Sequence, residues 1–352
     1  MTAFDGADLG ERLRHSEHPD PLYAALLDGA SDDWAAGGVM REILAGHEDD
    51  AAADMIHLRF LASLFRVVLT GDAPELEPFY PCLGGTAAPE GVWAVAEPVL
   101  RRWAPRVREG LAAHPQTNDP GRSIALLVGL SYAVRAHGLS RVRLLEPGAS
   151  AGLNLLLDRF RFVGDGWSWG PVGSPLVMDG LGLAGFAPPA VEVVSRRGCD
   201  LLPIDAASEE GAVLLRSFVW PSQVGRHERL SAALEVARVE PVIVDRAGAA
   251  DWLEAQLGGA AGPDGARGEV VEPGVLTVVW QSITRQYWPA EETRRVDALV
   301  AEARSRGPVA HVAMEDPRAV GLDPGDGLPV TIEVDGELVA RCHYHGVPVE
   351  LT

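Results

Sequence analysis

The segment Leu144-Leu145-Glu146-Pro147-Gly148-Ala149-Ser150-Ala151-Gly152-Leu153-Asn154 decides the fold of this chain. Its sequence predicts a strand over residues 142–146, a tight turn over 148–152 and a helix over 153–160. Small residues in such a turn let the backbone approach a ligand, and the start of a helix offers N–H groups that have no helical partner. We therefore expect a strand–turn–helix unit of a Rossmann-like sheet, with a ligand beside the turn.

Strands and helices alternate beyond this turn. Further strands are predicted at 191–195, 242–244, 275–281 and 309–314, and helices at 122–136, 209–219, 222–238, 248–257 and 290–306. This alternation is typical of βαβ units and a parallel sheet. The tail differs, because strands at 330–334 and 338–344 flank Asp335-Gly336, a hairpin signal. The predicted class is α/β, with a Rossmann-like, mostly parallel sheet that ends in an antiparallel hairpin.

The chain divides into two predicted regions. Residues 1–121 form an N-terminal helical region, in which apolar periodicity predicts helices at 56–70 and 92–112. Residues 122–352 form the Rossmann-like domain. Within it, the Gly- and Pro-rich stretch 163–190 is predicted to be an irregular insertion with a short hairpin, and 258–274 a loop. The helical region and the insertion are expected to cover the substrate.

All 30 basic residues among the 352 are arginine, against 50 acidic residues, and the formal net charge is −20. The absence of lysine excludes P-loop, pyridoxal Schiff-base and protein-kinase sites. The acidic balance disfavours nucleic acid and membrane as partners. Without a signal peptide or an apolar run of about 18 residues, the predicted location is the cytoplasm. The oligomeric state stays open.

The turn is compatible with an S-adenosylmethionine site. An acidic residue two positions before the first glycine, followed by Gly-x-x-x-Gly, resembles the first motif of class I S-adenosylmethionine-dependent methyltransferases, whose loop wraps the amino-acid part of the cofactor. The residues expected to hold the cofactor here are Glu146, Gly148, Ala149, Ser150, Gly152 and Asn154. Asp200, predicted to end the next strand, would bind the ribose, because a carboxylate accepts hydrogen bonds from two hydroxyls.

Three other interpretations of the turn remain. Gly148-Ala149-Ser150-Ala151-Gly152 also matches the G-x-S-x-G elbow of serine hydrolases, with Asp316 and His343 or His345 as partners. About 140 preceding helical residues count against it, because α/β-hydrolases place several strands before the elbow. A dinucleotide dehydrogenase would need glycine where Ser150 stands. The turn of a non-catalytic protein would only pack helix against strand.

Four blocks of sequence resemble the bacterial DUF2332 family, whose function is uncharacterised. They are Glu146 to Leu155 followed by Asp158-Arg159-Phe160, Gln116 to Arg122, Gly198 to Asp205, and Phe218 to Gln223 followed by Arg226. The resemblance runs from about residue 57 to the end. The family is similar to Rossmann-like methyltransferases. Where it often has a histidine before the serine at 282, this chain has Gln281.

The methyltransferase likeness implies roles for further residues. Gln116, Asn118 and Arg122 would fold over the cofactor, although Asn118 or Asp119 can equally cap a helix. The other assignments are Asp245 near the adenine, Ser282 and Tyr287 as catalytic residues near the methyl group, and Tyr80, Trp220, Gln223 and Arg226 at the substrate. Structural roles are about as well supported for most of them.

Two other kinds of site are disfavoured. His343 and His345 share one face of a strand but have no evident third metal ligand, so no metal is expected. Cys199 has no neighbouring histidine in the sequence to activate it as a nucleophile. The sequence thus predicts a methyltransferase that uses S-adenosylmethionine and an unknown small-molecule or peptide acceptor.

Overall fold

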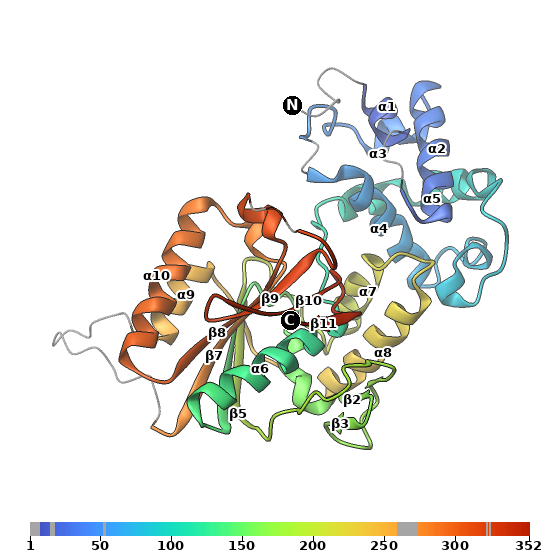
Figure 1. Ribbon diagram of the computed structural model, residues 1–352. Coiled ribbons are helices and arrows are strands. Elements are labelled where there is room, and N and C mark those ends of the chain that lie inside the picture. Colours follow the sequence, from blue (N-terminus) through green and yellow to red (C-terminus); the bar gives the residue numbers. More distant parts are fainter. Residues whose placement is uncertain (1–7, 15–17, 52–53, 259–272, 322, 324) are drawn as a thin grey trace. The chain divides into compact units, whose positions relative to one another are not determined.

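The structure of the chain is a computed structural model that describes residues 8–14, 18–51, 54–258, 273–321, 323 and 325–352. It contains two compact units (Figure 1). The helical unit comprises described residues of 1–117 and 209–228, and the sheet unit those of 118–208 and 229–352. Most of the predicted loop at 258–274 lies outside the described residues.

The helical unit is built from short helices around one apolar core. Its elements are α1 (Leu9–Arg14), α2 (Pro21–Ala35), α3 (Val39–Ile43), α4 (Ile56–Leu69), the 3-10 turns η2 (Glu77–Phe79) and η3 (Pro81–Leu83), α5 (Val92–Gly110), α7 (Glu209–Ser217) and the start of α8 (Val224–Val239). The helices predicted at 56–70 and 92–112 are confirmed. Non-helical backbone at Trp103 kinks α5 shortly before Pro105, whose ring does not fit a regular helical turn.

Residues 209–228 pack with the helical unit although they lie between two strands in sequence. Trp220 packs against the apolar core of this unit and makes an edge contact with His18, with ring centroids 4.5 Å apart. His227 makes a similar contact with Phe65 at 5.9 Å. Two aromatic side chains thus draw this segment away from the sheet, which alternation of strands and helices alone does not predict.

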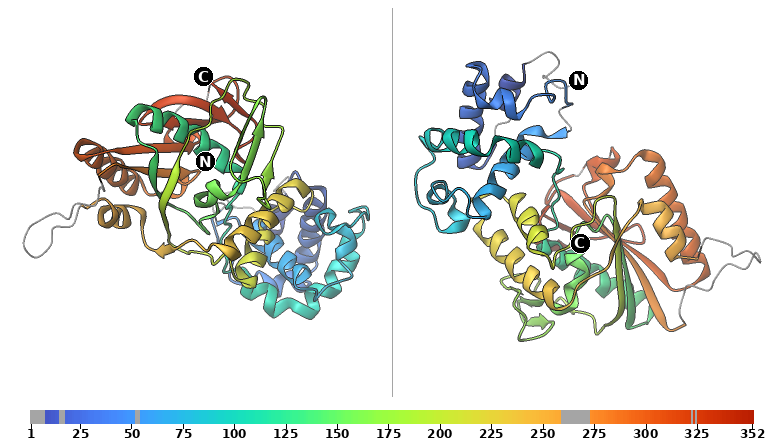
Figure 2. Two further views of the ribbon diagram at one scale, coloured as in Figure 1. Left: turned by 90° about the horizontal axis from the view of Figure 1, so that it is seen from below. Right: turned by 180° about the vertical axis from the view of Figure 1, so that it is seen from behind.

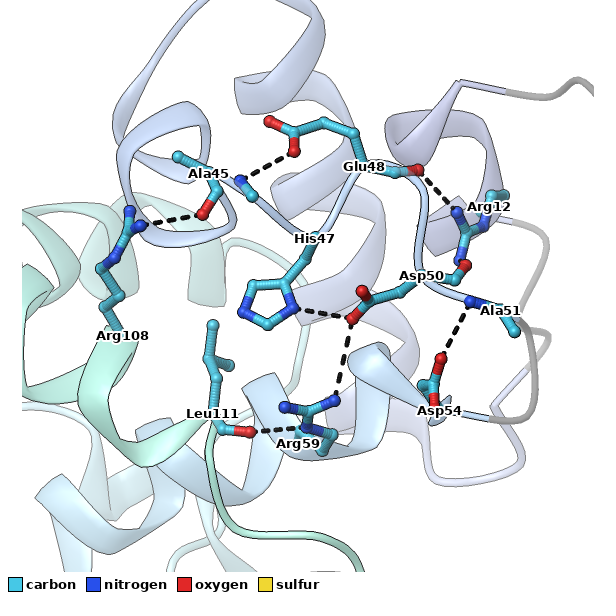
Figure 3. Close-up of polar contacts among 11 residues, drawn as sticks. Arg12, Ala45, His47, Glu48, Asp50, Ala51, Asp54, Arg59, Arg108 and Leu111 are labelled. Atoms are coloured by element: carbon cyan, nitrogen blue, oxygen red, sulfur yellow. Dashed lines mark hydrogen bonds and ion pairs between the residues drawn. The ribbon is translucent and has the colours of Figure 1, made fainter.

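Arginines clamp the loop after α3 through its backbone carbonyls (Figure 3). Arg12 donates to the carbonyls of Glu48 and Asp50 at 3.0 and 2.7 Å. The buried Arg59 donates to the Leu111 carbonyl at 2.5 Å and lies 3.7 Å from the Asp50 carboxylate. A planar guanidinium suits this arrangement, because its fork of donors reaches two acceptors at once.

Among the described residues, the main sheet of the sheet unit has eight strands, in the order β11-β10-β9-β8-β7-β1-β5-β6. They are β1 (Arg141–Pro147), β5 (Glu192–Asp200), β6 (Val244–Arg246), β7 (Val275–Ser282), β8 (Val309–Glu315), β9 (Val330–Val334), β10 (Glu337–Cys342) and β11 (Val349–Leu351). Strands β6, β5, β1, β7 and β8 run parallel, whereas β9, β10 and β11 continue as antiparallel neighbours. The α/β class and the terminal hairpin are confirmed.

Helices cover both faces of the parallel strands (Figures 1 and 2). Leu145 and Val279 pack with α9 (Ala249–Gln256) and α10 (Ala290–Arg306). On the other face lies α6 (Ser123–His137), where a methyl group on Gly129 would stand 2.3 Å from Val312. Since side chains alternate along a strand, Glu146 and Trp280 point toward the α6 face and Gln281 toward the α10 face.

The order of the parallel strands creates a topological switch point. From the central β1 the chain builds β5 and β6 on one side, then returns to build β7 and β8 on the other. In open α/β sheets, ligands bind outside the carboxyl ends of the strands at such a point. Glu146, Pro147 and the turn that follows stand at this position.

The predicted insertion carries the short strands β2 (Arg161–Gly164), β3 (Trp167–Trp169) and β4 (Val177–Met178), which form a separate small sheet. It borders a depression of about 730 Å³ beside Glu192 and Val193. These residues begin β5, whereas Asp200 ends it, so this depression lies at the end of the sheet away from the switch point. Across the described ranges, no helix has both the length and the apolar character needed to cross a bilayer.

We expect Arg59→Ala to lower the free energy of unfolding of the helical unit by about 2 kcal/mol or more, because it leaves the buried Leu111 carbonyl without its donor and removes the cation beside the Asp50 carboxylate, which keeps only His47 among the described residues. Urea unfolding followed by circular dichroism measures this. Arg101→Ala is the matched control, since the Arg101–Glu97 pair is exposed and should contribute less than about 0.5 kcal/mol. Equal effects of the two substitutions would contradict the structural role of Arg59.

Candidate functional site

The turn after β1 is held by the end of β5. The Cys199 carbonyl accepts hydrogen bonds from the N–H groups of Gly148 and Ala149 at 2.8 and 2.9 Å. The Asp200 carboxylate accepts one from the Ser150 N–H at 2.8 Å and one from the Leu202 N–H at 3.0 Å. Most of the turn's N–H groups are therefore bound within the protein and do not form a cradle for an anion.

Packing explains the glycines of the turn. Gly148 has φ +76°, and a methyl group there would lie 2.3 Å from Thr284 Oγ1. Gly152 has φ +72°, and a methyl group there would lie 3.0 Å from Val242 Cγ1. Both positions need glycine because the backbone is left-handed and a neighbour is close. Ser150 shares the left-handed region, with φ +53°.

The helix predicted after the turn is a 3-10 helix, η5 (Leu153–Arg159). Residues 153–157 are all fully buried, so packing on every side sets the tighter winding of this short segment. The Leu153 N–H is capped by Asn118 Oδ1 at 2.8 Å. Asn118 thus binds the backbone of a different helix from the one it was expected to cap, and the cap before Pro120 is made by Asp119, whose side chain accepts the Gly121 N–H at 2.9 Å.

Polar atoms without partners flank the turn. Glu146 is 1 % exposed and Asn154 is fully buried. Within the described part of the chain, Glu146 Oε2 and both amide atoms of Asn154 make no hydrogen bond, and neither does the indole N–H of the buried Trp280 on the adjacent strand. Leaving a buried polar group unsatisfied costs about 1–3 kcal/mol, so such groups indicate a partner such as a ligand or ordered water.

Burial also sets the charge of Glu146. It raises the pKa of this carboxyl to about 8. The Trp280 indole N–H, which is near the carboxyl but outside hydrogen-bonding geometry, and Arg122 offset only part of the shift. Arg122 is itself buried and donates to the Tyr344 carbonyl at 3.0 Å. The switch point therefore holds a carboxyl that is mostly protonated at pH 7 near a permanent cation.

Asp245, predicted near an adenine, has a structural set of contacts. Its carboxylate forms a bidentate ion pair with Arg197 at 2.6 and 2.8 Å and accepts the Trp252 indole N–H at 2.7 Å. These bonds lower the pKa of Asp245, Arg197 having the largest effect. Asp245 therefore ties the second and third parallel strands to α9.

The predicted catalytic residues lie after β7. Ser282 is the last residue of the strand and is buried. Tyr287 ends the 3-10 helix η6 (Arg285–Tyr287) and is 65 % exposed. Both are at the carboxyl edge of the sheet, where the sequence places them, and their catalytic role stays a prediction.

The predicted substrate residues belong to the helical unit. Tyr80 is buried in its core and stacks on Phe65 with ring centroids 4.6 Å apart. Gln223 accepts a hydrogen bond from Arg226 at 2.5 Å, and Trp220 packs on His18. The half-buried Gln116 also falls in this unit. The contacts of Tyr80 and Trp220 are those of core residues.

The hydrolase interpretation requires Asp316 to pair with His343 or His345, and the structure gives Asp316 and His345 other partners. Asp316 binds Arg318 at 2.9 Å and Tyr344 Oη at 2.5 Å. His345 Nδ1 lies instead 3.1 Å from the Asp119 carboxylate. Burial raises the pKa of the Cys199 thiol to about 12, which disfavours a reactive thiolate. In the part of the chain that the structure covers, no three His, Cys, Asp or Glu side chains are placed to hold a metal ion.

A second buried carboxyl, Glu315, ends β8. It accepts hydrogen bonds at 3.2–3.3 Å from Gln281 Nε2 and from the N–H groups of Thr284 and Arg285. Burial raises its pKa to about 7. The sequence places Glu315 only at a strand end, because the partners that surround it come from residues more than 20 positions away.

Comparison with protein families identifies this chain. Residues 13–351 match the family described as "Uncharacterized protein conserved in bacteria (DUF2332)". Because the match spans almost the whole chain, the protein belongs to this family. Neither the curated proteins nor the solved structures contain a match.

The pKa of Glu146 predicts a pH-dependent cost to stability. Between the ordinary carboxyl pKa of 4.5 and about 8, the unfolded state loses the Glu146 proton while the folded state keeps it, so stability falls as pH rises through this window. Glu146→Gln abolishes this effect. Its unfolding free energy relative to wild type should rise by at least about 1 kcal/mol between pH 5.5 and 8.5.

Chemical denaturation at the two pH values measures this difference. The exposed Glu192→Gln, at the far end of β5, is the control and should show no such change. A pH-independent difference between Glu146→Gln and wild type would show that Glu146 is ionised in the folded protein.

Proposed function

We propose that this member of the DUF2332 family is an S-adenosylmethionine-dependent methyltransferase that acts on a small-molecule or peptide acceptor. The observation that carries the proposal is the set of buried, unpartnered polar atoms of Glu146, Asn154 and Trp280 around the switch point. The turn itself is not the ligand cradle, since its N–H groups are bound internally. Side chains on either side of it would recognise the ligand.

These side chains suit an amino-acid group. An ammonium ion would favour the ionised form of Glu146, while the buried guanidinium of Arg122 suits a carboxylate. The Asn154 amide offers a donor and an acceptor, and the Trp280 indole a donor. The methionine part of S-adenosylmethionine carries both an ammonium and a carboxylate group.

Asp200 suits the ribose. Each of its carboxylate oxygens accepts one backbone N–H, and each has a further lone pair for a hydroxyl group. Its side chain is only partly buried, at the carboxyl end of β5. When bound, S-adenosylmethionine supplies an electrophilic methyl group. Alignment of the acceptor is then the main requirement, and Ser282 and Tyr287 stand at the same edge of the sheet to provide it.

We expect S-adenosylhomocysteine to bind the protein in isothermal titration calorimetry. Asn154→Leu should weaken binding at least tenfold, roughly the effect of one lost buried hydrogen bond to a charged or polar group. The same substitution should raise the thermal unfolding temperature of the ligand-free protein, because it removes two unsatisfied buried polar atoms while keeping the branched shape of the side chain. A residue with a purely structural role would not show these opposite effects.

Glu146→Gln should also weaken binding, and Glu192→Gln should leave it unchanged. Asp200 is a poor choice for substitution, since its carboxylate also holds the turn. Absence of binding to the folded wild-type protein would end the proposal.

One observation favours a serine hydrolase as a second candidate. Ser150 has a left-handed backbone, at φ +53°, in the turn that follows the parallel strand β1, as in a strained nucleophile elbow. If Ser150 is an activated nucleophile, a fluorophosphonate probe will label it, and Ser150→Ala will abolish the labelling, as read by mass spectrometry. An unlabelled Ser150 in folded protein would exclude this candidate.

A further inference from the structure

A separate cavity of about 380 Å³ lies on the α10 face of the sheet. Its floor is formed by β8 and β9, and Val300, Ala301 and Arg304 of α10 form one wall. In the antiparallel register, Ala313 is opposite Glu333 and Glu315 is opposite Thr331. The side chains of Glu315 and Glu333 therefore share this face as diagonal neighbours, with Cβ atoms roughly 7 Å apart.

A buried chain of hydrogen bonds runs along the cavity floor. His311 Nε2 lies 3.0 Å from Gln281 Oε1, and Gln281 Nε2 donates to Glu315 Oε1 at 3.2 Å. Desolvation, with Arg285 and Arg304, lowers the pKa of His311 to about 3, so the ring is neutral and its Nε2–H donates to Gln281. The Gln281 amide is thereby fixed with its N–H group toward Glu315, and Glu315 is held in place as an acceptor.

The charges that line the cavity do not balance. Its five carboxyl groups face two arginines, and both arginines already have partners: Arg285 pairs with Asp297 at 2.6 Å and Arg304 with Asp335 at 3.1 Å. Asp316 pairs with Arg318 outside the cavity. Among the described residues, Glu315 and Glu333 form no ion pair. The Glu333 carboxylate accepts the Thr331 hydroxyl at 3.2 Å and no other donor from the described residues.

We propose that this cavity binds a small organic cation, a primary or secondary amine, with its ammonium group between Glu315 and Glu333. The ammonium group supplies the positive charge that Glu315 and Glu333 lack, and its N–H groups can donate to the lone pairs that their present hydrogen bonds leave open. The apolar side chains of Val300, Ala301 and Ala313 would contact the carbon skeleton. A bare metal ion would leave that apolar part of the lining unused.

The cavity is distinct from the switch point. Gln281 and Trp280 are consecutive residues of β7 and point to opposite faces of the sheet. The segment after β7 contacts both regions, since the Thr284 side chain packs against Gly148 while its N–H donates to Glu315. Binding of an amine in this cavity does not depend on binding of S-adenosylmethionine at the switch point. The two proposals can therefore be tested separately.

Ligand-detected saturation-transfer NMR with butylamine tests the proposal, and 1-butanol serves as the neutral probe of the same size. Butylamine should bind measurably more tightly than 1-butanol. Glu315→Gln should weaken butylamine binding about tenfold, and the half-buried Glu333→Gln about threefold, because each removes one charged acceptor. Glu337→Gln, on the exposed start of the neighbouring β10, should leave it unchanged.

Amide spectra of the labelled protein locate the binding. Butylamine should shift the N–H signals of Thr284 and Arg285, which donate to Glu315. If Glu315→Gln fails to fold, Glu333→Gln and these amide shifts still decide the question. Equal binding of butylamine and 1-butanol, unchanged binding to Glu333→Gln, or shifts confined to other amides would each overturn the proposal.

Discussion

The attachment of the β1 turn to the end of β5 is the constraint on which the candidate site depends. The Cys199 carbonyl and the Asp200 carboxylate hold three successive N–H groups of the turn. Because β5 is the parallel neighbour of β1, these bonds fix the turn at the carboxyl edge. Glu146 before it and Asn154 after it are then held in buried positions, where neither can turn outward to find water. A rigid frame that keeps polar groups unsatisfied is what a preorganised binding site requires.

Because the chain has no lysine, arginine is the residue that supplies its cationic hydrogen bonds to backbone carbonyls. Arg12 and Arg108 each bind two carbonyls of the loop region in the helical unit, and Arg122 binds the Tyr344 carbonyl in the sheet unit. A guanidinium remains charged at any physiological pH, so these residues bind and orient but do not exchange protons. The buried carboxyls Glu146 and Glu315 differ in this respect, because burial raises their pKa values to about 8 and 7, where a carboxyl can exchange a proton near neutral pH.

Local sequence patterns predicted most of the fold. Periodicity located α4 and α10 to within a residue, and the turn motif correctly placed Glu146 and Asp200 at the carboxyl edge of adjacent strands. Tertiary contacts decided the rest. The aromatic side chains of Trp220 and His227 assign residues 209–228 to the helical unit, and burial winds residues 153–159 as a 3-10 helix. The cavity with Glu315 and Glu333 depends on the register between β8 and β9, which no local pattern encodes.

The central position of β7 has a consequence for how its register is specified. All eight of its residues are buried, so the alternation of apolar and polar residues that normally fixes a strand's register is absent. The consecutive Trp280 and Gln281 supply the missing asymmetry, because the indole faces the switch point and the amide faces the cavity. A deletion of one residue earlier in β7 would exchange the two faces, bringing the indole into the cavity and the amide to the switch point. Trp280 and Gln281 thus give the two faces of β7 different polar groups, and the same difference specifies the register of the strand.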